Sequence, residues 1–102
     1  MEISFPHIEI HVRALEPVEF LIAVDGKMIR AAIDWATMRE LLGAECAEQE
    51  VRDLIRQNRA SFELAMKAHL FARGVPLTRQ FVITLDELRD CLPCSARSPQ
   101  SA

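Results

Sequence analysis

The sequence VEFLIAVDGKMIRAAI, residues 18–33, decides the fold of this chain. Asp25 and Gly26 separate two apolar runs, and Asp-Gly is among the strongest signals for a two-residue hairpin, because its type I′ turn needs φ > 0 at both positions. Such a loop sets the pairs Val24 with Lys27, Ile22 with Ile29, Phe20 with Ala31, and Val18 with Ile33. These pairs share one almost wholly apolar face, so the sequence predicts a hairpin that is buried on one side.

Two strands are expected to join this hairpin. Alternation over residues 3–13 predicts a first strand, with Ile8, Ile10 and Val12 on one face and polar residues on the other. Pro6 should mark its start or an edge position. The β-branched and aromatic residues 79–84 predict the last strand.

Helices are expected to cover the apolar face. The apolar spacing changes from two to about 3.6 after Ile33, which predicts a short helix from an N-cap at Asp34 to Gly43. Residues 48–73 have the spacing of one long amphipathic helix, ended by Gly74. Thr84 begins a capping box for a further short helix that runs to about Cys91.

Together these elements predict an α+β fold. We expect a single small domain over residues 1–92, with an antiparallel sheet of about four strands. One long helix packs on one face of this sheet, and two short helices accompany it. Residues 93–102 contain little that could be buried and are predicted to be a disordered C-terminal tail.

Composition and charge reduce the range of functions that the chain can have. The 102 residues carry a net charge of −3, which gives no general attraction to nucleic acid or to an anionic membrane. The charge is uneven, because residues 1–50 carry four basic and ten acidic side chains, whereas residues 51–102 carry eight and five. No apolar run approaches the roughly 18 residues that cross a bilayer, and the first residues lack the pattern of a secretory signal. We therefore expect a cytoplasmic protein with reduced thiols.

The order and spacing of several motifs resemble a known family. Phe5-Pro6, Asp25-Gly26, Asn58-Arg59 and the run from Phe81 to Thr84 follow one another as in the proteobacterial domain-of-unknown-function family 1488. The similarity covers roughly residues 1 to 90. What the resemblance implies is a compact bacterial α+β domain, with no catalytic residues to carry over.

Metal-ligating residue types occur in three places. Cys91 and Cys94 have the C-x-x-C spacing of zinc half-sites and redox motifs, but Cys91 falls at the C-terminal end of a predicted helix, where the dipole does not favour a thiolate. The sequence HIEIH, residues 7–11, has the alternation of a solvated strand face as well as of a ligand set. We predict no metal site and no cofactor, with Cys91 and Cys94 as the remaining candidates, and we interpret His69 as a hydrogen-bonded residue at the edge of the core.

Basic side chains on the predicted long helix suggest nucleic-acid binding as another function. Arg52, Arg56, Arg59 and Lys67 form one stripe on it, which is one way to contact phosphates. Acidic residues interrupt the stripe, so we interpret it as a solvated ion-pair face and keep a nucleic-acid-binding regulator as the alternative. No serine elbow, phosphate loop or H-E-x-x-H motif occurs, and we predict that the protein is not an enzyme.

The outer face of the hairpin is more apolar than a solvated sheet face. Leu21, Ala23, Met28 and Ala32 lie on it, with Glu19 and Arg30 as its charges. Either the C-terminal helix or another subunit must cover this face. We therefore predict a homo-oligomer and a non-enzymatic interaction or regulatory module that binds other protein surfaces. Its predicted contact residues are Leu21, Met28, Arg30, Arg52, Arg56 and Arg59.

Overall fold

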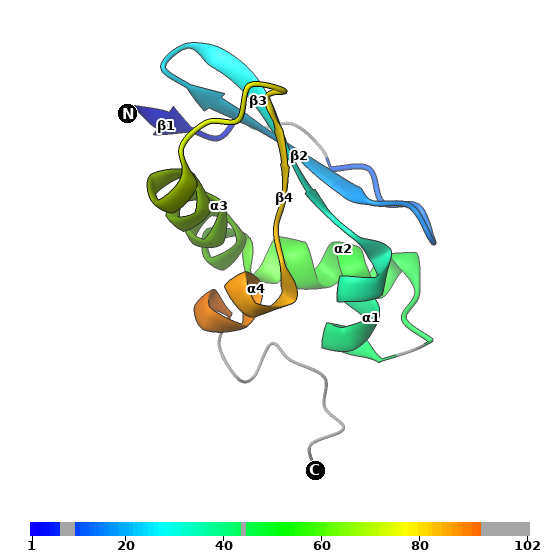
Figure 1. Ribbon diagram of the computed structural model, residues 1–102. Helices are drawn as coiled ribbons and strands as arrows, with labels where there is room; N and C mark the ends of the chain where they lie inside the picture. Colours follow the sequence, from blue (N-terminus) through cyan, green and yellow to red (C-terminus); the bar gives the residue numbers. More distant parts are fainter. Residues whose placement is uncertain (7–9, 44, 93–102) are drawn as a thin grey trace.

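The computed structural model describes residues 1–6, 10–43 and 45–92. These residues form one sheet in the strand order β1-β2-β3-β4 and four helices, which is the α+β class expected from the sequence (Figure 1). Along the chain the elements are β1 (Ile3–Ser4), β2 (Val18–Val24), β3 (Lys27–Ile33), α1 (Trp35–Leu42), α2 (Glu48–Gln57), α3 (Arg59–Arg73), β4 (Gln80–Val82) and α4 (Leu85–Cys91). The predicted tail, residues 93–102, lies outside the described residues.

The central hairpin is confirmed in every pair. Strands β2 and β3 are antiparallel, and their register runs from Val18 opposite Ile33 to Val24 opposite Lys27. Asp25 has φ 50° and Gly26 has φ 81°, the two positive values that a type I′ turn needs. Asp25 also holds β1 beside the hairpin, because its Oδ1 accepts a hydrogen bond from the Glu2 backbone N–H at 2.8 Å.

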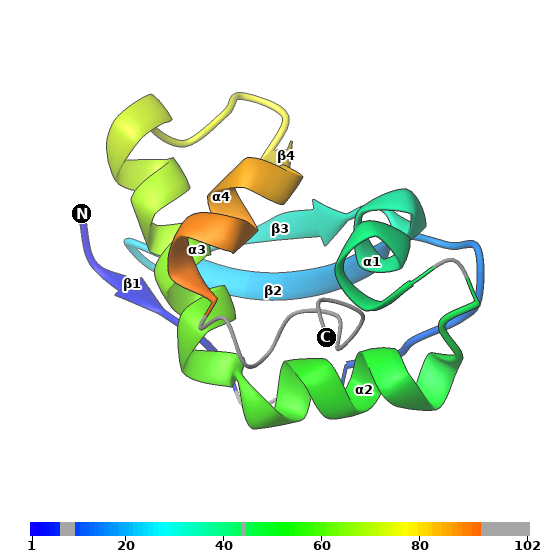
Figure 2. The same cartoon turned by 90° about the horizontal axis from the view of Figure 1, so that it is seen from below.

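The core lies between the sheet and the helices. All four described helices lie on the same side of the sheet, as two views at right angles show (Figures 1 and 2). The inward side chains of the hairpin are buried there against the apolar sides of the helices, as sequence periodicity predicts. The largest fully buried members of this core include Ile22, Ile29, Ile33, Met38, Phe62, Met66, Leu70 and Leu88.

The sheet is mixed rather than wholly antiparallel. Strand β4 pairs in parallel with β3, and Phe81 lies opposite Ala31. The three helices between these strands return the chain to the end of the sheet where β3 began, so β4 runs in the same direction as β3. The remaining two pairings, β1 with β2 and β2 with β3, are antiparallel.

The predicted first strand over residues 3–13 is wrong for most of its length. Of its described residues, Ile3–Ser4 alone pair in the sheet, and residues 5, 6 and 10–13 form no strand. The chain leaves β2 because helices α2 and α3 bind it: Arg59 Nη2 donates to the Pro6 carbonyl at 3.4 Å, and Arg52 Nη2 donates to the Val12 carbonyl at 3.2 Å. Val12 is nevertheless buried in the core.

The predicted long helix over residues 48–73 is two helices. Asn58 ends α2 with φ −124° and ψ 29°, and its side-chain Nδ2 donates to the Leu54 carbonyl at 3.0 Å. Asparagine side chains compete in this way for backbone groups, which favours helix ends over helix interiors. The chain therefore turns at Asn58, and α3 leaves α2 in a different direction (Figure 2).

The expected helix ends are at their predicted positions. Gly43 and Gly74 end α1 and α3 with positive φ values of 110° and 76°. Thr84 caps α4, accepting a hydrogen bond from the Glu87 backbone N–H at 3.3 Å. Asp34 precedes α1 as the N-cap residue, but its side chain makes no capping hydrogen bond. Within the described residues, no helix is both long and apolar enough to span a membrane.

Candidate functional site

The outer sheet face is the side of the sheet that points away from the helices. It consists of alternate residues from three strands, namely Glu19, Leu21, Ala23, Met28, Arg30, Ala32, Gln80 and Val82. Leu21, Met28 and Val82 expose 37%, 45% and 48% of their surface. Glu19, Arg30 and Gln80 are exposed among them, but the face carries more apolar side chains than the side of an antiparallel sheet that faces water usually does.

The C-terminal helix does not cover this face. Helix α4 packs against α3 and α1, both of which lie on the opposite side of the sheet (Figures 1 and 2). Leu88 and Leu92 are buried in the core on that side. The sequence left two ways to cover the outer sheet face, the C-terminal helix or another subunit. The position of α4 excludes the first.

The four basic residues do not form one stripe. Arg52 and Arg59 donate to the Val12 and Pro6 carbonyls, and Arg59 Nε also forms an ion pair with Glu63 Oε2 at 3.0 Å. Lys67 Nζ lies 5.6 Å from the centre of the Phe5 ring. Arg56 is exposed at the end of α2. Three of the predicted phosphate contacts therefore bind the N-terminal segment of their own chain.

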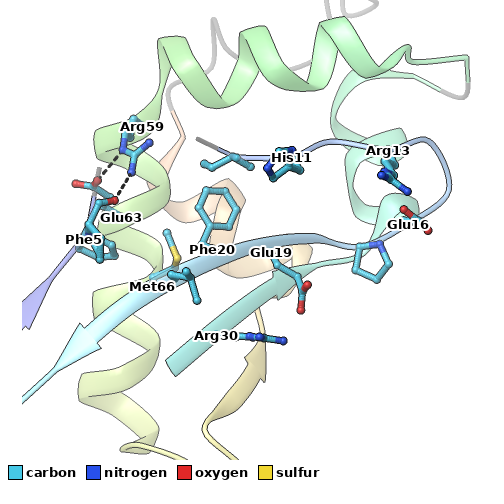
Figure 3. A pocket seen from close by; sticks show the side chains of 14 residues that line it. Phe5, His11, Arg13, Glu16, Glu19, Phe20, Arg30, Arg59, Glu63 and Met66 are labelled. Carbon is cyan, nitrogen blue, oxygen red and sulfur yellow. Dashed lines mark hydrogen bonds and ion pairs between the residues drawn. The ribbon is translucent and has the colours of Figure 1, made fainter. Parts of the chain in front are cut away.

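A hollow of about 410 Å³ lies between β2, residues 10–17 and α3 (Figure 3). The buried side chains of Phe20 and Met66 line it, together with charged residues of both signs. Arg59 and Glu63 neutralise each other at one side of the hollow, as the dashed lines in Figure 3 show. Its described lining residues include no serine, threonine, cysteine or lysine.

The two described thiols, Cys46 and Cys91, lack the surroundings of a reactive cysteine. Cys46 and Cys91 are free, and burial raises the pKa of both, with Glu50 raising that of Cys46 further and Asp90 that of Cys91. Across the described residues, no group of three or more His, Cys, Asp or Glu side chains is placed to hold a metal ion. Cys94, His7 and Glu9 lie outside these residues.

We expect slow alkylation of these thiols. The Cys94→Ser variant isolates Cys46 and Cys91, and their reaction with iodoacetamide should reach half its maximal rate above the ordinary cysteine pKa of 9.0. The rate is measured by mass spectrometry against pH, with glutathione as the reference thiol. A midpoint below neutral pH at Cys91 would contradict the expectation and favour a thiol function.

His69 is a hydrogen-bonded residue at the edge of the core, as predicted. Its Nδ1 lies 2.7 Å from Glu87 Oε2, and its ring stacks on Phe81 with 4.4 Å between the ring centres. Glu87 Oε1 also accepts hydrogen bonds from the Thr84 backbone N–H and hydroxyl, each at 3.0 Å. Burial raises the pKa of Glu87, but these hydrogen bonds from Thr84 and His69 outweigh it and place the pKa below 4.5. The cluster joins α3, β4 and α4.

A second apolar surface was missed in the sequence. The exposed side of α3 carries Ala60, Leu64, Ala68 and Phe71, and Val75 follows the helix. These positions recur at intervals of four and three, which was a usable signal. It was hidden because the inner residues of α3 have the same spacing on the opposite side of the helix.

Comparison with known proteins gives no match: no family model, no curated protein and no solved structure corresponds to this chain. The resemblance to family 1488 therefore stays a prediction. The evidence for function lies in the chain's own surfaces, and the outer sheet face is one that the described helices leave bare.

Proposed function

We propose that this chain is a non-enzymatic protein-interaction module that associates with a second copy through the outer sheet face. The observation that carries the proposal is the exposure of Leu21, Met28 and Val82 on adjacent strands of a sheet whose other side carries the core. Exposed apolar side chains that gather on one face with a few charges among them are typical of protein contacts. Burial in a complex would stabilise the face by roughly 25 cal/mol per Å² of apolar area removed from water.

The charges of the face favour a second copy as its occupant. Glu19 and Arg30 are both exposed there, and they have opposite signs. In a two-fold pairing both copies contribute the same patch. Glu19 of each copy can therefore meet Arg30 of the other, which gives two such contacts. Face-to-face sheets lie about 10 Å apart, a distance that a glutamate and an arginine span together.

The size of the face predicts a weak dimer. Strands β2 and β3 are each seven residues long. At about 3.3 Å per residue and 4.8 Å per strand, three strands give a flat area of roughly 300 Å². Stable complexes bury about 800 Å² per partner, so we expect an association that depends on concentration.

Met28→Glu is expected to abolish this association. A carboxylate buried in the contact without a partner, here at the hairpin end of the face, costs far more than the apolar contact it replaces. Sedimentation over a concentration series should show a dimer for the wild type and a monomer for the variant. Leu77→Glu, the same kind of change at a fully exposed loop residue, is the control and should behave as the wild type. A monomeric wild type at every concentration would overturn the proposal.

A charge exchange tests the two-fold arrangement. Glu19→Arg and Arg30→Glu should each weaken self-association, because each places like charges opposite one another. An equimolar mixture of the two variants should associate more tightly than either alone, since both contacts between the unlike chains are then attractive. Equal association of the mixture and the single variants would show that these residues do not meet across the contact.

Nucleic-acid binding is placed second, because Arg52 and Arg59 already donate to the Val12 and Pro6 carbonyls. A labelled DNA duplex separates the two functions. Binding at low salt that weakens steeply as salt is added would favour a nucleic-acid-binding regulator.

A further inference from the structure

Strand β2 has a free edge over part of its length. Strand β1 covers the hairpin end of this edge, where Ser4 lies opposite Ala23 and the Asp25 backbone N–H donates to the Glu2 carbonyl at 2.8 Å. Strand β1 ends at Ser4. Among the described residues, the rest of β2, residues 18–22, therefore has no partner strand on this side.

The backbone groups of Glu19 and Leu21 point to this free edge. In a strand, the N–H and C=O groups of successive residues point alternately to its two sides. The N–H of Asp25 points to β1 and Ala23 lies opposite a β1 residue, so Leu21 and Glu19 follow at intervals of two on the same side. Within the described part of the chain, nothing donates to or accepts from the backbone of Glu19 or Leu21 on this side.

The hollow of about 410 Å³ lies at this edge (Figure 3). Its lining includes Phe20 and Met66 from the core side of the sheet, and Glu19, Leu21 and Arg30 from the outer side. A space that is lined from both sides of the sheet lies beside β2 rather than on either face. Phe20 and Met66 expose 5% and 1% of their surface and give the hollow an apolar floor.

We propose that the free edge of β2 binds an extended segment of another protein as an added antiparallel strand. Backbone donors and acceptors that lack a partner strand are the groups that such a segment pairs with. The segment would run in the direction of β1, which is antiparallel to β2 at the same edge.

The register of the added strand follows from the direction of these groups. The residues opposite Leu21 and Glu19 would each exchange two backbone hydrogen bonds with β2. The residue between them would lie opposite Phe20 and point to the same side of the sheet as Phe20 does. Its side chain would therefore enter the hollow, where an apolar group fits against Phe20 and Met66.

The opposite edge of the sheet suits an added strand less well. Strand β4 is three residues long, and short edge strands resist pairing with other chains. The Arg79 carbonyl accepts from β3, so the next carbonyl, that of Gln80, points away from β3. The Thr78 hydroxyl already donates to this Gln80 carbonyl at 3.3 Å. One of the groups that an added strand would need is thus occupied.

A short peptide tests the proposal. The probe has blocked ends and roughly seven residues, the length of β2, with Val-Leu-Lys at its centre. In the proposed register its leucine lies opposite Phe20, its valine opposite Leu21 and its lysine opposite Glu19, whose charge it complements. Titration into the isotope-labelled full chain should shift the NMR signals of the Glu19 and Leu21 amides and give an affinity. The absence of binding to the wild type would overturn the inference.

Methylation of single peptide nitrogens distinguishes strand pairing from other kinds of binding. A methyl group on the valine or the lysine nitrogen removes one hydrogen bond to β2 and should weaken binding about tenfold. The leucine nitrogen points away from β2, so its methylation should leave the affinity unchanged. An effect that does not alternate along the peptide would show that the peptide does not bind as a strand.

Hydrogen exchange of the chain's own amides is the second measurement. The amides of Glu19 and Leu21 should exchange rapidly in the free chain and slowly with the peptide bound. Slow exchange in the free chain would mean that another part of the chain already pairs with this edge, which would contradict the proposal. Leu21→Pro removes one donor that points away from β3, so it should keep the hairpin and weaken peptide binding about tenfold.

Met28→Glu is the control, because Met28 lies on β3 and not at the free edge. Its peptide affinity should equal that of the wild type. An affinity that falls in Met28→Glu as far as in Leu21→Pro would place the peptide on the outer sheet face instead. The inference extends the proposed role in protein interaction to a second site, and loss of self-association in Met28→Glu bears on the outer sheet face alone.

Discussion

Phe62→Ala is expected to reduce the free energy of unfolding by about 3–5 kcal/mol, the range for a truncated core aromatic residue. Phe62 is fully buried on the inner side of α3, and its ring stacks on Phe20 of β2 with 5.9 Å between the ring centres. Its backbone N–H donates to the Asn58 carbonyl at 3.1 Å, just after the turn between α2 and α3. The residue therefore joins the hairpin to the point where the helical segment changes direction.

Urea denaturation followed by circular dichroism measures this loss. A domain of this size has a total stability of about 5–15 kcal/mol, so the variant should unfold at much lower urea concentration. Leu64→Ala is the control two positions along the helix, and its exposed side chain predicts a change within about 0.5 kcal/mol. A loss below 1 kcal/mol in Phe62→Ala would mean that the contact between α3 and β2 is not central to the core.

Local sequence signals were enough to predict the hairpin and the helix ends. Asp25 and Gly26 fix the length of the loop, and the two-residue alternation then fixes every pair between β2 and β3. Thr84 and Glu87 lie three residues apart, so their capping contact is equally local. Each of these features depends on neighbours within a few positions, which is the information that sequence periodicity contains.

The path of the N-terminal segment depended on distant residues. Ile8, Ile10 and Val12 have the spacing of a strand, yet the carbonyl of Val12 is bound by Arg52, 40 positions later. Arg59 reaches Pro6 over 53 positions in the same way. Because the sequence gives no measure of such contacts, these arginines were interpreted as solvent-facing, and the strand was extended too far.

The outer sheet face and the exposed apolar side of α3 differed in how readily they could be found. Alternation in β2 and β3 placed Leu21 and Met28 on the outer face at once. The exposed apolar side of α3 was missed because Leu64 and Phe71 lie between buried residues along the helix, and the two sides are told apart by how α3 packs. Apolar periodicity identifies a helix with one apolar side more easily than a helix with two.

Glu87→Gln should be the second most damaging change, with an expected loss of about 1.5–3 kcal/mol at pH 7, the range for hydrogen bonds to a charged group. Oε2 of Glu87 lies 2.7 Å from His69 Nδ1, and Oε1 accepts from Thr84. A glutamine has the same shape but no charge, so its contacts with Thr84 and His69 lose the strength that the carboxylate charge gives them. His69→Phe is the companion variant, because it preserves a ring that can stack on Phe81 while removing the Nδ1 contact. It should lose less stability than Glu87→Gln.

The difference between the wild type and Glu87→Gln should shrink in acid. Hydrogen bonds from Thr84 and His69 outweigh the burial that raises the pKa of Glu87, so its pKa in the folded chain lies below 4.5. A carboxylate with a lowered folded pKa stabilises the protein above its unfolded pKa, and this contribution disappears as the pH falls through the folded value. Urea unfolding at pH 7, 5 and 3 should therefore show the wild type approaching the variant below pH 4.5. A difference that stays constant over this range would mean that the charge of Glu87 contributes nothing and that only its shape supports α4.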